Sequence, residues 1–471
     1  MTPIENPFRL TDSERKKILS LALSRGGEFA EIFAEYGLFN VINMEEDIIK
    51  ETAESVSLGL GIRVISGEKT GYGYTNDLSF KNIKKTALTA AAIADSTKTA
   101  AIPGFRRTRG RRDIYPVHQP AHQASLEDKI ALVRRAYIAC QKVSPRIQKV
   151  KVLFHDHIQC LSIAHSEGRT AEDTRPQIKL VCTAVAEKDG QREFGFYGGG
   201  GRVGLEYFER VQTPENIGRE AAEEALRLLE AVDAPAGEMP VVLAPGHAGV
   251  LVHEAVGHLL EADFNRKRTS IFWDKMGRKV GSPLLTIYDD PTRPSFRGSY
   301  GIDDEGTRPA KTLLIDRGVV HSFLQDRLSA RIMGRELTGH GRRQDFTCIP
   351  LPRMSNTYVD RGGDDPEDIL KSVGKGIYAE RFEGGQVEDS GKFTFSISAG
   401  HLIEGGRLTA PIKQATLIGT NIDILQKIEM VGCDLEFGLQ TGTCSKEGQD
   451  VPVTDGCPTI KISSMTVGGQ R

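Results

Sequence analysis

The chain has 471 residues, enough for two or three domains, and 39% of them are hydrophobic, as in an ordinary globular protein. A formal net charge of −2 and a pI near 6.6 give no overall field that would favour nucleic acid or an anionic membrane. The sequence contains no signal-peptide pattern and no apolar run long enough to cross a bilayer. We therefore expect a soluble, cytoplasmic protein without nucleic-acid or membrane partners.

The first half of the chain mixes helices with hairpins. Thr11–Glu14 is a capping box that opens a helix ending at Gly26-Gly27, and the segments 56–65 and 71–75 alternate as the two strands of a hairpin. A further helix is expected through Ile83 and Ala91. Ser125 caps another helix, and Thr213-Pro214 begins one that continues to Leu229.

Three segments between these elements could carry function, but each has a simpler interpretation. Five arginines in 105–112 are most simply a solvated linker rather than a nucleic-acid patch. His155 and His157 fall on one side of a strand, yet no third metal ligand is near, so exposed strand histidines are expected. The glycine run 198–201 lacks the ending of a phosphate loop and predicts a turn or a close backbone approach.

Residues 231–240 are rich in Ala, Pro and Gly and predict a linker, with a domain boundary near residue 236. We expect an α+β protein: a mixed α/β N-terminal domain, 1–236, and a mostly antiparallel β domain, 237–471. Short alternating segments separated by glycine turns predict a barrel or sandwich in the second domain. Two helices, Arg327–Arg335 and Pro366–Ile377, are expected among its strands, in addition to the helix that carries the metal-site motif.

That motif begins at His253, where two histidines bracket a carboxylate in the pattern HExxxH. His253 and His258 could hold a catalytic zinc, and Glu254 could deprotonate its water. The histidines of the usual HExxH motif are four residues apart, whereas here they are five apart, about 140° around an ideal α-helix. Both could face one ion if the helix carries a π-bulge or breaks near Gly257. Otherwise the segment is a buried helix with two hydrogen-bonded histidines.

A catalytic zinc needs a third protein ligand. Glu261 and Asp263 are local, but they could instead orient the histidines through hydrogen bonds. Cys433, Cys444 and Cys457 are distant in sequence. Cys444 stands out because it belongs to the polar, glycine-containing segment 440–449, where a thiol is a poor core residue, and because Lys446 would favour its thiolate form.

Several separated motifs together resemble one known family. They are the segment 249–263 with its HExxxH pattern, Gly341-Arg-Arg-Gln, 352–358, Cys444-Ser-Lys-Glu-Gly-Gln449, Thr466-Val-Gly-Gly469, the hairpin segments 61–65 and 71–75, the glycines 198–201 and Gly384-Gly-Gln-Val387. The pattern resembles the TldD/PmbA family of DNA gyrase modulators, specifically its TldD-type zinc metalloprotease subunit. Because the motifs extend over nearly the whole chain, accidental agreement is excluded.

The resemblance implies zinc bound by His253, His258 and Cys444, with Glu254 as the catalytic base. It further implies a peptidase that hydrolyses short or unfolded peptides bound as extended strands. The family also implies a dimer, either of two identical chains or with an inactive sister subunit of the PmbA/TldE type. Because the inactive sister lacks HExxxH and this chain retains it, we expect the catalytic type.

A different class of function remains open, namely a non-enzymatic modulator or binding protein whose metal is structural. A structural zinc usually has four ligands, and Glu254 would have no role in such a site. Residues that stabilise the oxyanion of the reaction are not identified by the sequence. The candidates Arg342, Arg343, Arg353 and His401 are more simply structural residues, because nothing in the sequence places them near the metal.

Overall fold

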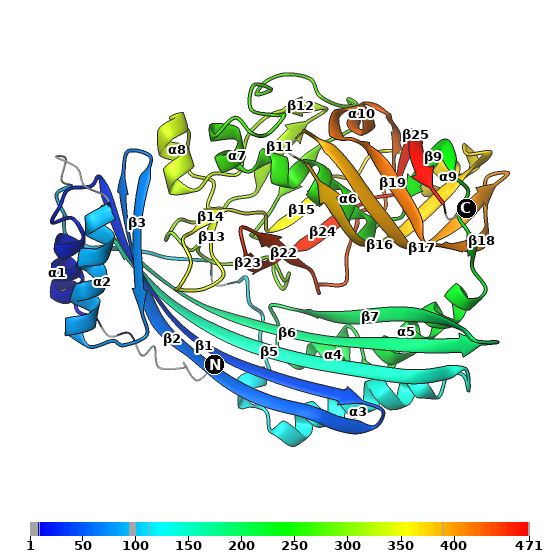
Figure 1. Ribbon diagram of the computed structural model, residues 1–471, viewed down its shortest axis with the longest axis horizontal. Helices are drawn as coiled ribbons and strands as arrows, with labels where there is room; N and C mark the ends of the chain where they lie inside the picture. Colours follow the sequence, from blue (N-terminus) through cyan, green and yellow to red (C-terminus); the bar gives the residue numbers. More distant parts are fainter. Residues whose placement is uncertain (1–7, 9, 94–99, 112, 389, 470–471) are drawn as a thin grey trace.

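The computed structural model describes residues 8, 10–93, 100–111, 113–388 and 390–469. The first half of the chain builds a long curved sheet with helices, and the second half forms a strand-rich body on the concave side of that sheet (Figure 1). This architecture confirms the predicted α+β fold class. The short strand β8 (Val232–Asp233) precedes the predicted boundary at residue 236 and pairs with a strand of the second half.

The first half forms one seven-stranded sheet with the order β3-β2-β1-β5-β6-β4, in which β7 also pairs with β6. Its elements are α1 (Asp12–Ala22), β1 (Phe29–Glu45), β2 (Ile48–Ser66), β3 (Lys69–Thr75), α2 (Phe80–Ile93), β4 (Arg106–Thr108), η1 (Ala121–Gln123), α3 (Leu126–Gln141), β5 (Ile147–His165), β6 (Arg169–Lys188), β7 (Gln191–Gly201), α4 (Tyr207–Arg210) and α5 (Pro214–Leu229). All pairings are antiparallel except β4 with β6.

The predicted helix starts are confirmed by their capping geometry. Thr11 and Glu14 form the capping box of α1. Ser125 accepts the backbone N–H of Asp128 at the start of α3. Thr213 caps α5, with Pro214 as its first helical residue. In each case the side-chain oxygen satisfies an N–H that the helix itself leaves free, which is why these starts could be located from sequence.

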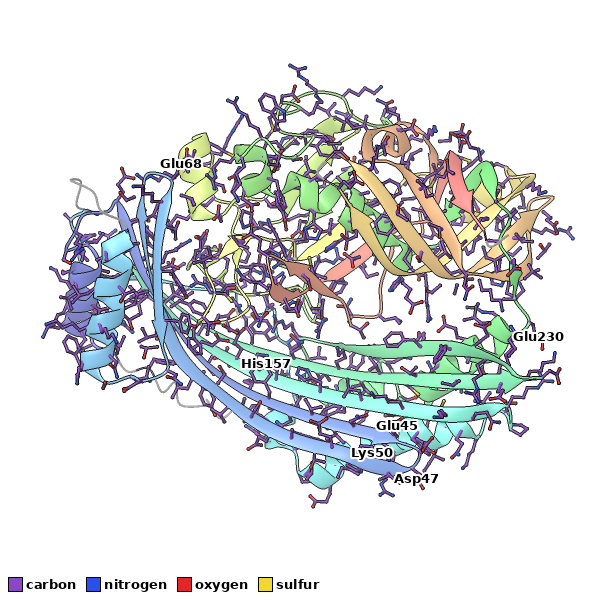
Figure 2. All side chains as sticks on the ribbon, in the orientation of Figure 1. Glu45, Asp47, Lys50, Glu68, His157 and Glu230 are labelled. Atoms are coloured by element: carbon purple, nitrogen blue, oxygen red, sulfur yellow. The ribbon has the colours of Figure 1, made fainter. Side chains whose placement is uncertain are left out.

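Alternation along the long strands gives the sheet two different faces. Even-numbered side chains such as Ile32 and Ile62 pack beneath α1 and α2, while Phe154 and Leu180 pack beneath α3 and α5. The opposite, concave face contacts the second half at one end, where Phe33 joins a cluster with Ile302 and Phe346. Towards the β1–β2 turn, marked by Asp47 and Lys50 in Figure 2, side chains on this face become half-exposed.

The second half contains a closed barrel of five strands, β16-β9-β25-β19-β17, because β17 pairs back to β16. A second sheet has the order β12-β11-β10-β15-β24-β21. The elements are β9 (Gly237–Leu243), η2 (His247–Gly249), α6 (Val250–Val252), η3 (His253–Gly257), η4 (His258–Leu260), α7 (Ala262–Arg266), β10 (Ile287–Asp289), β11 (Thr312–Asp316), β12 (Val319–Val320), α8 (Arg327–Met333), β13 (Gly341–Arg342), β14 (Leu351–Pro352), β15 (Asn356–Val359), α9 (Pro366–Lys371), β16 (Lys375–Val387), β17 (Lys392–Glu404), β18 (Arg407–Lys413), β19 (Ala415–Thr420), α10 (Asn421–Gln426), β20 (Ile428–Val431), β21 (Glu436–Phe437), β22 (Thr443–Lys446), β23 (Gln449–Pro452), β24 (Thr454–Cys457) and β25 (Ile460–Gly468).

Four expectations need correction, three in the second half and its connection and one in the first half. The helix predicted over Pro366–Ile377 ends at Lys371, because residues from Lys375 onward pair with both β9 and β17 in the barrel. The predicted linker is partly strand, since β9 begins at Gly237. Helix α10 was not predicted. The glycines 198–201 end β7 and are not a turn.

The alternative expectation for these glycines, a close backbone approach, is confirmed. A Cβ on Gly200 would lie 2.1 Å from the backbone oxygen of Ile178 on β6. A Cβ on Gly198 would lie 3.2 Å from a side-chain carbon of Thr441, which belongs to the second half of the chain. The glycine run therefore lets β7 lie close to the segment that precedes Cys444.

Candidate metal centre

The motif segment forms a π-helix, η3 (His253–Gly257), between α6 and η4. In a π-helix the backbone hydrogen bonds join residues five apart, so His253 and His258 lie on one face despite their spacing. Their ring centroids are 5.1 Å apart. The predicted departure from α-geometry is therefore confirmed. Gly257 permits it beside a buried neighbour, because a Cβ there would lie 2.0 Å from Met354 Sδ.

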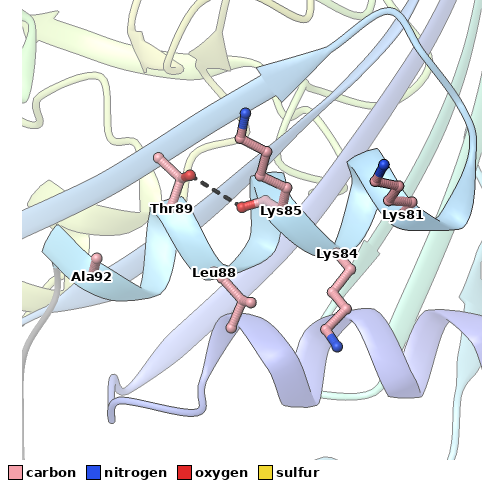
Figure 3. A pocket seen from close by; sticks show the side chains of 6 residues that line it. All are labelled: Lys81, Lys84, Lys85, Leu88, Thr89 and Ala92. Atoms are coloured by element: carbon pink, nitrogen blue, oxygen red, sulfur yellow. Dashed lines mark hydrogen bonds between the residues drawn. The ribbon is translucent and has the colours of Figure 1, made fainter.

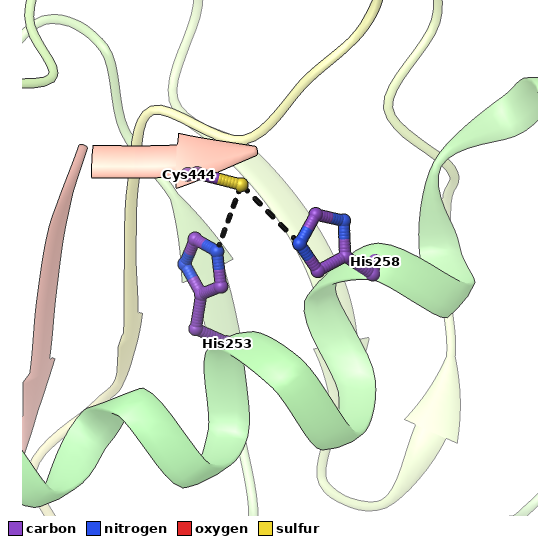
Figure 4. Close-up of side chains that lie close together, drawn as sticks. All are labelled: His253, His258 and Cys444. Atoms are coloured by element: carbon purple, nitrogen blue, oxygen red, sulfur yellow. Dashed lines mark hydrogen bonds between the residues drawn. The ribbon is translucent and has the colours of Figure 1, made fainter. Parts of the chain in front are cut away.

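Cys444 approaches both histidines from the hairpin β22–β23 (Figure 4). Its Sγ lies 3.3 Å from His253 Nε2 and 3.2 Å from His258 Nε2. The three ligand atoms all lie within 4.8 Å of one another, close enough to hold one metal ion. The segment 440–449, expected to be a loop, instead fixes the cysteine on a strand that ends in a two-residue turn at Glu447 and Gly448.

Each histidine has a carboxylate behind its other ring nitrogen. Asp455 Oδ1 lies 2.6 Å from His253 Nδ1, and Glu261 Oε2 lies 3.1 Å from His258 Nδ1. The Glu261 contact is a hydrogen bond and the Asp455 contact an ion pair, and a carboxylate at Nδ1 favours the form that leaves the Nε2 lone pair free for a metal. Glu261 thus orients His258 and does not act as a third ligand. The sequence alone leaves both of these roles open.

Lys446 has a different role from the one expected. Its Nζ lies 2.8 Å from Glu261 Oε2 and 2.8 Å from Asp263 Oδ1, so it neutralises two buried carboxylates. Burial opposes ionisation of the Cys444 thiol. The neighbouring His258 and His253 outweigh burial and hold the pKa of this thiol well below its usual value. Burial likewise opposes protonation of His258, yet Cys444 and Glu261 raise the pKa of its ring to about 10. The ionised thiol and the protonated imidazoles thus stabilise one another in this cluster.

Glu254 lies at the accessible side of the three ligands. Its side chain is 31% exposed, and its Oε2 is 3.8 Å from His258 Nε2. His253 and Cys444, by contrast, are 3% and 4% exposed. Solvent can therefore reach the cluster from the side on which Glu254 lies.

Of the four oxyanion candidates, the structure brings one beside the cluster. Arg353 NH2 lies 3.2 Å from Cys444 Sγ and 2.6 Å from the Cys444 backbone oxygen. Arg342 instead donates to the backbone oxygens of Met354 and Pro452. Arg343 binds Glu31 of the sheet, and His401 lies beside Glu380. Arg353 is fully buried, so it steadies the cysteine from behind.

The other sequence candidates lie apart from this cluster. His155 and His157 project from the same face of β5, as expected, but they are half-buried rather than exposed, and His157 stacks on Phe39 at 3.7 Å. The arginine segment contributes β4 and an exposed pair between Arg107 and Glu172; Arg112 lies outside the described residues. Across the described ranges, the only grouped potential metal ligands are His253, His258 and Cys444.

A surface hollow on α2 has none of the features of a catalytic site. Figure 3 shows its lining, which consists of Lys81, Lys84, Lys85, Leu88, Thr89 and Ala92. No carboxylate, histidine or thiol is among these side chains. The hydrogen bond drawn in the figure is a local one from the Thr89 hydroxyl to the Lys85 backbone oxygen.

Sequence reasoning missed Asp455 altogether. It lies in Val453-Thr-Asp-Gly-Cys457, a segment with no recognisable motif. The strand β24 that carries it pairs with β15 in parallel and with β21, and this pairing alone places the carboxylate behind His253. No signal in the sequence distinguishes this aspartate from the other carboxylates of the chain.

Comparison with known proteins identifies the class to which this fold and cluster belong. Three models of PmbA/TldA metallopeptidase domains match the chain: domain 1 over residues 30–94, the central domain over 119–229 and the C-terminal domain over 236–469. The chain belongs to the TldD/PmbA family of metallopeptidases.

Curated relatives extend over almost the whole chain. A protein of Haemophilus influenzae named "Metalloprotease TldD homolog" is 40% identical, with 98% of this chain and 97% of the relative covered. A metalloprotease of Methanocaldococcus jannaschii is 34% identical, with 91% and 95% covered. A "Zinc metalloprotease TldD homolog" of Saccharolobus solfataricus is 26% identical, with 96% and 99% covered.

Solved structures share the fold. A Thermotoga maritima protein named as a DNA gyrase modulator superposes with a TM-score of 0.79 at 22% identity, covering 97% of this chain and all of that one. TldE from Thermococcus kodakarensis gives a TM-score of 0.74 at 18% identity, covering 96% and 99%. Within the described residues, none of the helices has both the length and the apolar character needed to span a membrane.

Proposed function

We propose that this chain is a zinc-dependent peptidase in which His253, His258 and Cys444 hold the metal and Glu254 is the general base. The observation that carries the proposal is the convergence of two imidazole nitrogens and one thiol within 4.8 Å, beside an accessible carboxylate. The relatives named as metalloproteases support the reaction class.

The donor set fits zinc. Thiolate and imidazole are its preferred protein ligands, and three ligands leave one position for substrate or water, as in catalytic rather than structural sites. Asp455 and Glu261 support this fit because they hold both Nδ1 atoms and direct both Nε2 atoms towards Cys444. When bound, the metal would polarise the peptide carbonyl and lower the pKa of water.

Glu254 performs the proton transfers in this proposal. Its carboxylate accepts a proton from the attacking water and delivers that proton to the leaving amine. Partial exposure allows it to meet the substrate, and its position next to His253 in sequence keeps it at the edge of the cluster. Arg353 and Lys446 hold their positions behind the ligands and do not face the substrate.

The hairpin that carries Cys444 suits an extended peptide. Because a two-residue turn makes Lys446 and Gln449 the closing hydrogen-bonded pair, Thr443 and Ser445 direct their N–H and C=O groups away from β23. Among the described strands β22 pairs only with β23, so its outer edge is free. A substrate strand added there would lie against the metal ligands, and main-chain hydrogen bonds would accept short or unfolded peptides of many sequences.

The test is the substitution Glu254→Gln, measured by zinc content and by hydrolysis of casein and short peptides. We expect one zinc per chain and no hydrolysis, because the amide cannot accept the proton. Glu447→Gln, which changes an exposed carboxylate in the hairpin turn, is the matched control and should retain full activity. Full activity of Glu254→Gln would contradict the assignment. Zinc without hydrolysis in the unmodified protein would favour the non-enzymatic alternative.

We further propose that the chain works as a dimer, with a second copy or with an inactive sister chain. The likeness to TldE supports a sister partner. Two large apolar side chains on β7 are also exposed to solvent, Phe194 at 64% and Phe196 at 42%, as is common at protein interfaces. Native mass measurement with and without a co-expressed sister chain distinguishes the two assemblies, and a monomer in both samples would refute the proposal.

A further inference from the structure

Four positive side chains gather where β22 faces the concave side of the sheet, and we call them the basic cluster: Lys179, Arg202, Arg297 and Arg342. None of them forms an ion pair with a carboxylate of the described residues. Other arginines on the same face of the sheet are neutralised. Arg63 NH2 lies 2.7 Å from Glu31 Oε2, and Arg175 NH1 lies 2.7 Å from Asp304 Oδ1.

The basic cluster reaches the strand that carries the metal-binding cysteine. Arg297 Nε donates to the Gly442 backbone oxygen at 2.7 Å, and its NH2 donates to Thr443 Oγ1 at 3.4 Å. Arg202 Nε in turn donates to the Arg297 backbone oxygen at 3.1 Å. Thr443 is exposed and is the residue before Cys444. The cluster thus lies next to the free edge of β22.

Lys179 is the member of the cluster that has no partner among the described residues. It lies opposite His155 in the pairing of β5 with β6, is half-buried, and has no hydrogen-bond or ion-pair partner among the described residues. His157, labelled in Figure 2, lies two residues from His155 on the same concave face. Buried His155 Nδ1 also has no partner in the described part of the chain. Lys179 Nζ and His155 Nδ1 are thus polar atoms for which the described residues provide no partner, whereas Gln177 accepts from the Arg297 guanidinium.

The energetics of these charges favour an anion. Burial lowers the pKa of Lys179 to about 8, with a further contribution from Arg297. Burial, then Arg202 and Arg342, lower the pKa of Arg297 to about 9. Charges that are desolvated and mutually repulsive destabilise the protein unless a negative group joins them. A carboxylate between Lys179 and Arg297 would remove this penalty and gain charge-assisted hydrogen bonds.

We propose that Lys179 and Arg297, with the Thr443 hydroxyl, bind a carboxylate of the peptide substrate. The inference rests on the proposed peptidase function, and it adds a substrate class: peptides with a negative group a few residues from the cleaved bond. The carboxylate comes from the peptide's C-terminus or from an Asp or Glu side chain. Recognition of the former would make the enzyme favour bonds near the end of its substrate.

The experiment compares one peptide in three forms: a free C-terminal acid, a C-terminal amide, and an amide with a glutamate at the last position. We expect kcat/KM to be on the order of tenfold higher for the free acid than for the amide, as one charge-assisted contact provides. A gain only for the glutamate form would assign the subsite to side chains. Equal kcat/KM for all three forms would overturn the proposal.

Lys179→Gln tests the cluster without disturbing the hairpin, because Lys179 has no protein partner there to lose. We expect this substitution to bring the acid-to-amide ratio close to one. Lys151→Gln is the matched control, since Lys151 is an exposed lysine on the same face of β5. It should keep the ratio of the unmodified protein. A Lys179→Gln protein that keeps the full ratio contradicts the assignment.

A binding measurement separates this inference from the peptidase proposal. Fluorescence anisotropy of labelled acid and amide peptides is measured on zinc-loaded Glu254→Gln protein, with and without Lys179→Gln. A preference for the acid that depends on Lys179, in a protein whose parent hydrolyses nothing, would support the subsite and refute the peptidase. Hydrolysis by the unmodified protein, without any preference for the acid peptide, would support the peptidase and refute the subsite. Failure of the acid peptide to bind also overturns the subsite.

Discussion

Replacement of Gly257 by alanine tests whether the π-helix is held by close packing against Met354, which lies between β14 and β15. The added Cβ would lie 2.0 Å from Met354 Sδ and 3.1 Å from its Cε. Ordinary carbon contacts are about 3.5–4.0 Å, so Met354 must move by roughly 1.5 Å. Met354 is fully buried, and its backbone N–H donates to Glu261 Oε1 at 3.3 Å. The displacement therefore reaches the carboxylate that orients His258.

Two effects of opposite sign act on the free energy of unfolding. Alanine has a better helix propensity than glycine by about 1 kcal/mol, whereas overpacking a filled core costs about 1–3 kcal/mol. Because the contact at Gly257 is so short, we expect the steric effect to prevail and the metal-free protein to lose about 1–2 kcal/mol. Zinc affinity should fall on the order of tenfold, since His258 loses its alignment.

The effect of Gly257→Ala on the free energy of unfolding should change sign when a smaller side chain replaces Met354. Met354→Ala alone should cost about 2–5 kcal/mol through the cavity it leaves. In that background Gly257→Ala should stabilise the protein, because its methyl group partly fills the cavity and helix propensity is gained. Urea unfolding of the four metal-free proteins, followed by fluorescence of the single tryptophan, Trp273, measures the cycle. A native-background Gly257→Ala protein that is as stable as its parent would refute the reasoning.

Three further predictions concern buried carboxylates. Asp455→Asn should weaken zinc binding about 10- to 100-fold, because the amide lacks the negative charge that holds the His253 ring; chelator competition measures this, and an unchanged affinity would remove Asp455 from the site. Arg63→Met should destabilise the protein by about 3–5 kcal/mol, since buried Glu305 loses its arginine partner and Glu31 keeps only Arg343, whereas loss of an exposed pair costs at most about 1 kcal/mol; urea unfolding decides. Burial raises the pKa of Glu35 to about 7, so its contribution to stability is full below pH 4.5 and is lost as the pH rises to 7; Glu35→Gln should flatten this part of the stability profile, and an unchanged profile would contradict the assignment.

Local capping rules located helix starts correctly wherever a nearby side chain satisfies the N–H groups that the helix leaves free. Thr11, Ser125 and Thr213 cap their helices as expected, because the partners of these oxygens lie within three residues. The same rules failed at Pro366–Ile377, where a helical start is followed by residues that the barrel recruits as β16. Cross-strand partners on β9 and β17 outweighed the local preference there.

The long strands show a second limit. The hairpin segments 56–65 and 71–75 were predicted, but β2 begins at Ile48 and runs 19 residues. Its early part is polar and exposed, so alternation there gives no signal. Pairing with β1 along its whole length keeps this part extended, and the shape of the concave face depends on it.

The sequence alone determined the chemistry of the candidate site. HExxxH supplies two imidazoles and a carboxylate, and the five-residue spacing required a non-α helix if both histidines face one ion. The choice of Cys444 followed only from its polar surroundings and from family resemblance. Residue type and spacing can be read directly from the sequence, and they do not depend on distant contacts.

Only the tertiary structure decided which groups surround those residues. It assigned Glu261 and Asp455 to the histidines, moved Lys446 from the thiol to two carboxylates, and brought Arg353 behind Cys444. Within the described residues it also left the basic cluster without an ion pair to a carboxylate. Such neighbours come from strands that meet only when the sheet and the barrel close, so no local pattern in the sequence can specify them.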